Sequence, residues 1–162
     1  MYRQLGAEAV DLDNPENLKA FFKATQQLLE TEQVLAYHDR SDGGLIVTAC
    51  EMAFAGQLGI ELDTGESADL LAWAFNEEPG ALIQVRESEV SAVTQAYEQA
   101  GFRGASGAIA VVGRIVEDRH ITVSVSGEKH FESPLRLLHA RWHETSFRIQ
   151  QLRDNPDSAE QE

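Results

Sequence analysis

Cysteine and long apolar runs are scarce in this sequence, and each scarcity excludes a class of protein. A single cysteine, Cys50, cannot form a disulfide within the chain or a multi-cysteine zinc site, which fits a reducing compartment. No stretch of about eighteen apolar residues exists, and the first residues have no apolar signal region. We therefore expect a cytoplasmic protein that does not enter membranes.

Basic residues are also few, because 13 Lys and Arg face 27 Asp and Glu, for a net charge of -14. A chain with this balance has no basic excess to displace the counterions of a nucleic acid, and an anionic membrane surface repels it. The acidity is uneven: residues 1–80 carry 4 basic and 15 acidic side chains, and residues 81–162 carry 9 and 12. Any anionic ligand therefore requires a local site.

The apolar content of 43% is enough for a folded core, and its periodicity predicts alternating helices and strands. We expect an α+β fold in α/β layers, with a mixed, largely antiparallel sheet covered by helices. Residues 117–120 are expected to join the last two strands as a hairpin. The predicted helices are 12–33, 45–55, 67–75, 88–99 and 133–153, and the predicted strands are 34–38, 58–62, 81–85, 109–116 and 121–125.

Two alternatives exist for the start of the first helix. Asn14 can cap it with Pro15 at the first helical position, or Asp13 and Glu16 can form a capping box. At the end of the second helix, Gly56 is placed to close the carboxyl terminus.

The loop at residues 39–44 is the most informative stretch, because it follows an apolar strand and opens into an apolar helix. Free backbone N–H groups and the positive end of the helix dipole meet there, which favours an anion. Gly43 and Gly44 allow a ligand to approach the backbone and can take positive φ. Ser41 can donate its hydroxyl to phosphate, and Arg40 adds positive charge.

Two carboxylates in the same loop modify this prediction. Asp39 and Asp42 repel a phosphate unless a cation lies between them, so the loop suggests Mg²⁺ bound together with phosphate. Asp42 can instead simply cap the helix. An ordinary strand-to-helix turn capped by Ser41 or Asp42 remains an alternative to a ligand site.

Six segments, in order along nearly the whole chain, closely resemble the late part of the large phosphoribosylformylglycinamidine synthase family of purine biosynthesis. They are residues 36–45, 51–56, 75–78, 80–85, 142–146 and 152–156. That family is a multidomain ligase with two synthase-like halves followed by a glutaminase domain. The resemblance implies that residues 1–153 form the C-terminal subdomain of the second half, with a fold like the C-terminal domain of aminoimidazole ribonucleotide synthase-like proteins, and that residues 154–162 form an acidic linker.

The resemblance also implies a function for the whole polypeptide. The family uses ATP and glutamine to convert formylglycinamide ribonucleotide to formylglycinamidine ribonucleotide, a carbon–nitrogen ligase reaction. The partners implied are the missing synthase-like and glutaminase domains of the same polypeptide, so this piece is expected to be inactive alone and to self-associate through the surfaces those domains cover. The alternative is a stand-alone acidic α/β module that binds a small phosphorylated ligand.

Two positions in the loop match functional positions of the family. Asp39 matches a magnesium ligand and Ser41 a nucleotide contact, so we expect Mg²⁺ and ATP or ADP at a site that Arg40, Gly43 and Gly44 also line. The site would be incomplete in this piece. No catalytic residue is expected here, and Cys50 matches no nucleophile motif.

Three weaker patterns have simpler explanations. His139 and His143 are four residues apart on a predicted helix, but no further ligand completes a metal site. The polar run at 75–78 is sufficiently explained as a turn before the next strand. An apolar stripe predicts that the last helix packs against a core; its members are Leu135, Leu138, Trp142, Ile149 and Leu152.

Overall fold

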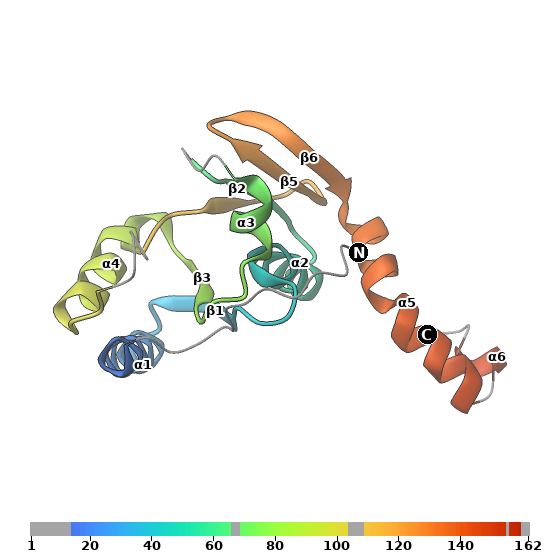
Figure 1. Cartoon of the computed structure of the whole chain (residues 1–162), viewed down its shortest axis with the longest axis horizontal. Helices are drawn as coiled ribbons and strands as arrows, with labels where there is room; N and C mark the ends of the chain where they lie inside the picture. The colour runs from blue at the N-terminus through green and yellow to red at the C-terminus, as the bar shows by residue number, and fades with distance from the viewer. Residues whose placement is uncertain (1–13, 66–68, 104–108, 155, 160–162) are drawn as a thin grey trace. The chain divides into compact units, whose positions relative to one another are not determined.

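The computed structural model describes residues 14–65, 69–103, 109–154 and 156–159 (Figure 1). The chain divides into two compact units, Met1–Thr48 with Leu71–Val111, and Ala49–Leu70 with Val112–Glu162. The first division falls inside one helix, α2 (Gly44–Gly56). No helix among the described residues is long and apolar enough to cross a membrane.

The first unit contains a two-stranded antiparallel sheet and the helices packed on it. Strand β1 (Val34–Asp39) pairs with β3 (Ala81–Val85), so that Asp39 lies opposite Ala81 at one end. The helices are α1 (Pro15–Glu30), the start of α2, most of α3 (Leu70–Phe75) and α4 (Val90–Gln99), which follows the short 3₁₀ turn η1 (Glu87–Glu89).

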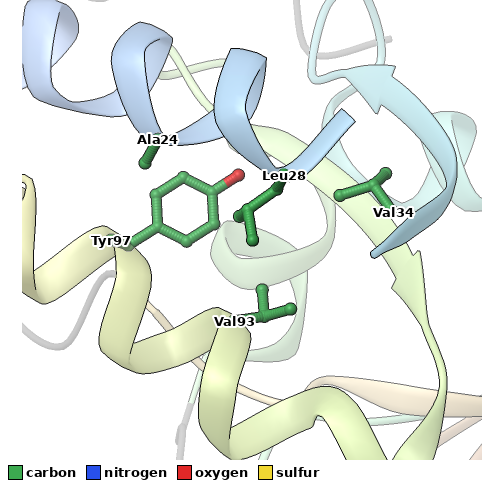
Figure 2. Packing of buried hydrophobic residues seen from close by; sticks show 5 residues of the cluster. All are labelled: Ala24, Leu28, Val34, Val93 and Tyr97. Atoms are coloured by element: carbon green, nitrogen blue, oxygen red, sulfur yellow. The ribbon is translucent and has the colours of Figure 1, made fainter. Parts of the chain in front are cut away.

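The core of this unit lies where α1 and α4 meet over the sheet (Figure 2). The Phe21 and Tyr97 rings stack with their centroids 5.8 Å apart, and the Tyr97 hydroxyl lies 2.9 Å from Thr25 Oγ1 in the buried interior. The buried apolar members of the cluster are Ala24, Leu28, Val34, Val93 and Tyr97. Ala24 and Leu28 lie one helical turn apart on α1, and Val34 lies on β1, so α1 turns one apolar face towards this core.

Helix α1 starts as one of the two alternatives predicted. The Asn14 side chain accepts hydrogen bonds from the amides of Glu16 and Asn17, at 3.0 and 3.2 Å, and Pro15 occupies the first helical position. Asp13 lies outside the described residues. Helix α2 ends at Gly56 as expected, but Gln57, with φ of 54°, adopts the left-handed conformation expected of the glycine.

The second unit contains a four-stranded sheet in the order β4-β2-β5-β6. Strand β2 (Gly59–Asp63) runs antiparallel to β4 (Gly113–Val116) and parallel to β5 (His120–Val125), which pairs antiparallel with β6 (Glu128–Pro134). The expected mixed, largely antiparallel arrangement is confirmed, although the described strands form two sheets. Helix α5 (Leu135–Arg153) follows β6, and α6 (Pro156–Ala159) forms a short turn in the expected tail. The predicted boundary at residue 154 stays a prediction.

The predicted hairpin between residues 109–116 and 121–125 is wrong, because β2 lies between β4 and β5. The hairpin is instead formed by β5 and β6 across Ser126 and Gly127, whose φ angles of 50° and 81° suit a tight two-residue turn. Strand β6 was missed because it is a polar edge strand without apolar alternation. Since β6 extends to Pro134, the last helix begins at Leu135 and not at Ser133 as predicted.

The apolar stripe of α5 is also misassigned as core. Leu135 is buried, but Trp142 is 51% exposed, Ile149 56% and Leu152 89%. Trp142 packs against Phe54 of α2 in the same unit, with ring centroids 5.7 Å apart. Regular apolar spacing defines a helix face but does not specify which part of the protein covers it.

One carboxylate ties the end of β2 to the β5–β6 hairpin. Asp63 accepts hydrogen bonds from the amides of Gly65 (2.8 Å), Gly127 (2.8 Å) and Ser126 (3.1 Å). Hydrogen bonds from Gly65, and then from Gly127, hold the pKa of the Asp63 carboxyl below its usual range. The charged form is therefore favoured in the folded state.

Asp63→Asn should lower the free energy of unfolding at neutral pH and flatten its dependence on acid. With its pKa lowered on folding, the carboxylate stabilises the fold above about pH 4, its unfolded pKa, and this contribution disappears as the pH falls through the folded pKa. Urea unfolding between pH 7 and 3 measures this. Glu117→Gln, at an exposed glutamate of the same unit, should behave as wild type; equal acid slopes for wild type and Asp63→Asn would contradict the assignment.

The buried Thr25–Tyr97 pair should show coupling in a double-mutant cycle. Tyr97→Phe and Thr25→Val each leave the partner hydroxyl buried without a hydrogen bond, so each should cost about 1–3 kcal/mol of unfolding free energy. The double variant should lose less than the sum of the two in denaturant unfolding. Strict additivity would show that the two hydroxyls do not stabilise one another.

Candidate functional site

The predicted loop connects the end of β1 to the start of α2 within the first unit. Arg40, Ser41, Asp42 and Gly43 span the gap, and the Gly44 amide donates to the Ser41 carbonyl at 2.9 Å. Gly43 and Gly44 have φ of 85° and 69°, a region that favours glycine. The loop is therefore a tight turn rather than an extended connection.

Arg40 is directed to the segment between α3 and β3. Its amide donates to the Gly80 carbonyl at 2.8 Å, and its Nε donates to the Glu78 carbonyl at 2.6 Å. Burial lowers the pKa of Arg40, and the nearby Glu78 carboxylate opposes that shift. Part of the guanidinium is therefore committed to a backbone carbonyl, and this contact fixes where the predicted positive charge lies.

The amino end of α2 is capped by an exposed carboxylate from the segment between α3 and β3, a contact that the sequence did not reveal. Glu77 Oε1 accepts a hydrogen bond from the Gly43 amide at 2.7 Å. Within the described part of the chain, neither the Ser41 nor the Asp42 side chain accepts a hydrogen bond from a backbone amide at this end of the helix. Glu77 lies in the run at 75–78, interpreted above as a simple turn, and no local signal pairs residues 34 positions apart.

Gly44 serves the packing of α2 on the end of α3. A Cβ at this position would lie 2.6 Å from the Phe75 carbonyl carbon and 2.8 Å from the Asn76 oxygen, distances that no side chain tolerates. Its amide is bonded to Ser41. The predicted role of Gly44 in approaching a ligand stays a prediction, but contact with the protein's own backbone already requires the glycine.

Asp39 and Ser41 are the two predicted site residues whose side chains remain available. Both are exposed, and within the described residues neither side chain makes a hydrogen bond or ion pair. Burial raises the pKa of the neighbouring Tyr37, and the Asp39 charge raises it further. The structure thus presents one carboxylate and one hydroxyl to solvent, on residues that are two positions apart in the chain.

The surroundings of these two groups are acidic, since Asp42, Glu77 and Glu78 are also exposed on the adjoining segments. A phosphate at this place needs a cation to offset the repulsion. Mg²⁺ in proteins is commonly held by one or two carboxylates, with phosphate oxygens and waters as the other ligands. Asp39 fits that role, although no group of three or more His, Cys, Asp or Glu side chains that could hold a metal ion occurs among the described residues.

The other candidates from the sequence show no comparable arrangement. The His139 and His143 rings stack with centroids 6.1 Å apart on α5, and the described residues add no third ligand. Burial, followed by the nearby Glu51, raises the pKa of the Cys50 thiol to about 11. A thiol with that pKa is a poor nucleophile at neutral pH, in agreement with its lack of a motif.

Comparison with known proteins places the chain in a family, and almost the whole of this chain matches a curated protein. The C-terminal domain of AIR synthase related proteins matches residues 2–126. Phosphoribosylformylglycinamidine synthase of Schizosaccharomyces pombe is 43% identical over 164 residues, covering 99% of this chain. The chain spans 12% of the length of that relative.

Solved structures of Thermotoga maritima PurL share the fold at low sequence identity. The complex with AMPPCP superposes with a TM-score of 0.68 at 19% identity, covering 82% of this chain and 24% of that chain. The complex with ATP gives 0.68 at 18%, covering 80% and 23%, and the complex with FGAR gives 0.65 at 18%, covering 74% and 20%.

These structural matches agree with the mixed α and β architecture described above, and the family match covers both the candidate loop and most of the four-stranded sheet. The chain therefore belongs to the AIR synthase related protein family, as a representative of its C-terminal domain.

Proposed function

We propose that this chain is the C-terminal subdomain of the second synthase-like half of a large phosphoribosylformylglycinamidine synthase. In that role it is part of an ATP- and glutamine-dependent carbon–nitrogen ligase that makes formylglycinamidine ribonucleotide in the cytoplasm. The observation that carries the proposal is the 43% identity to the Schizosaccharomyces pombe enzyme over 99% of this chain.

Within such an enzyme the chain contributes part of a magnesium–nucleotide site. Asp39 supplies a carboxylate to Mg²⁺, and the Ser41 hydroxyl donates to a phosphate oxygen of ATP or ADP. The support is their exposure and lack of partners in the described part of the chain, together with the solved complexes of Thermotoga maritima PurL with ATP, ADP and AMPPCP. Bound Mg²⁺ would offset the repulsion between phosphate and the acidic loop.

The rest of the site and the catalytic residues come from other domains of the same polypeptide. This part of the proposal is supported by the small share, 12%, of the relative's length that the chain spans. It also follows from the chemistry, since phosphoryl transfer needs several groups placed around the phosphates at once. The subdomain is therefore a contributor to a site and is inactive alone.

Asp39→Asn in the complete polypeptide should weaken Mg²⁺-dependent ADP retention at least about tenfold, since an amide is a poorer ligand for a hard cation than a carboxylate. Glutaminase activity should change much less. Nucleotide content after purification and calorimetric titration with MgADP measure the effect. Asp42→Asn removes an equal charge three residues away and should leave binding unchanged or tighter; equal losses in both variants would contradict a specific ligand role.

The isolated 162-residue chain should bind ATP with at best about millimolar affinity, worth about 4 kcal/mol. The reason is that its exposed carboxylates repel the nucleotide while most magnesium ligands are missing. Calorimetry with ATP and Mg²⁺ tests binding, and an ADP-release assay with formylglycinamide ribonucleotide and ammonia tests activity. Micromolar affinity or substrate-dependent ADP release would favour a self-sufficient module that binds a phosphorylated ligand.

A further inference from the structure

Residues 76–80, between α3 and β3, hold the candidate loop at two points. We name them the clamp segment. At the first point, Arg40 donates from Nε to the Glu78 carbonyl (2.6 Å) and from its amide to the Gly80 carbonyl (2.8 Å). At the second, the Glu77 carboxylate accepts from the Gly43 amide (2.7 Å). The clamp segment is itself braced, because the Asn76 side chain accepts from the Glu78 amide at 2.7 Å.

We propose that Glu77 is a positioning residue for the nucleotide site: it fixes the loop that presents Asp39 and Ser41 and does not itself contact the nucleotide or the metal. This inference rests on the proposed function, since it assigns a role within that same site.

The backbone restraints support this role. Asp39 is held at its main chain, because it is paired with Ala81 at the end of the β1–β3 ladder. Ser41 lies between Arg40 and Gly43, the two residues that the clamp segment holds. The side chains of Asp39 and Ser41 thus remain free while the backbone on both sides of them is restrained, which is the arrangement that lowers the ordering cost of binding a ligand.

Glu77 differs from the other contacts of the clamp because it acts through its side chain. The bonds to Arg40 end on backbone carbonyls, which any residue supplies, whereas the bond to Gly43 requires an acceptor that reaches across from the neighbouring segment. Gly43 has a φ of 85° and no side chain to restrain it, so an external hydrogen bond limits its freedom.

The hydrogen bond of the Glu77 carboxylate is also the reason for not assigning Glu77 as a ligand of the metal or the nucleotide. It already accepts the Gly43 amide at the positive end of α2, where charge and hydrogen-bond geometry both favour a carboxylate. A variant that keeps the length and an acceptor oxygen should keep the hydrogen bond to Gly43 and most of the site, although it loses the attraction to the helix end. A variant that keeps the charge but is too short to reach Gly43 should not.

A pair of substitutions in the complete polypeptide distinguishes these properties. Glu77→Gln keeps the length and an acceptor oxygen but loses the charge, while Glu77→Asp keeps the charge but is one methylene shorter. Glu78→Gln is the matched control for charge: it removes one carboxylate from the same segment, and with it the attraction to Arg40, but keeps the backbone carbonyl to which Arg40 donates. Two measurements are made on each: hydrogen–deuterium exchange of peptides covering residues 40–47, and the dissociation constant of MgADP by calorimetry.

We expect Glu77→Asp to speed exchange in the loop peptides and to weaken MgADP about tenfold. Glu77→Gln should stay within about threefold of wild type in both measurements, as should Glu78→Gln. Peptides from α4 should exchange as in wild type throughout, which shows that the unit remains folded.

Three results would overturn the proposal. Unchanged MgADP affinity in Glu77→Asp despite faster exchange would make Glu77 a purely structural cap. A loss of MgADP affinity in Glu77→Gln but not in Glu77→Asp would make the charge, and not the hydrogen bond to Gly43, the essential property. Tighter binding in both variants would mean that Glu77 competes with the nucleotide. If wild type binds no MgADP, the proposed function fails and this role of Glu77 fails with it, whereas the three results above leave nucleotide binding by wild type intact.

Discussion

The amino end of α2 approaches the backbone at the end of α3 so closely that position 44 has room only for glycine. The other features of the loop depend on this contact. It brings residues 76–80 beside the turn that follows β1, where the Glu77 carboxylate meets the Gly43 amide and the Arg40 side chain meets the Glu78 carbonyl. A wider spacing would place both partners beyond hydrogen-bond distance.

Much of the local structure could be predicted from the sequence, because it depends on residues close together in the chain. Helix α1 and the strands beginning at Val34 and Ala81 follow from periodicity, and the Asn14 cap was one of two alternatives that neighbouring residues offered. The order of the second sheet could not be obtained this way, since the insertion of β2 between β4 and β5 is a long-range pairing. Strand β6 lacks the apolar alternation on which such a prediction relies.

In the candidate site too, features that depend on local sequence could be predicted and features that depend on long-range contacts could not. Its loop and its available side chains, Asp39 and Ser41, were recognisable from local chemistry and from the family resemblance. Glu77 was not, because the tie to Gly43 links segments that only the folded chain brings together. The two glycines were expected to take positive φ, which they do, and to admit a ligand, whereas the structure shows Gly44 admitting the backbone of α3. The spacing of apolar residues on α5 likewise could not distinguish a covered face from an exposed one.

The three-way bonding of Asp63 makes the length of an exposed turn part of the architecture of the sheet. Two of its three hydrogen bonds come from consecutive amides at Ser126 and Gly127, the tip of the β5–β6 hairpin. Surface turns of this kind ordinarily tolerate inserted residues. Here an insertion would move both amides away from the carboxylate and would free the end of β2 as well, so solvent exposure is a poor guide to where this chain accepts a tag or a label.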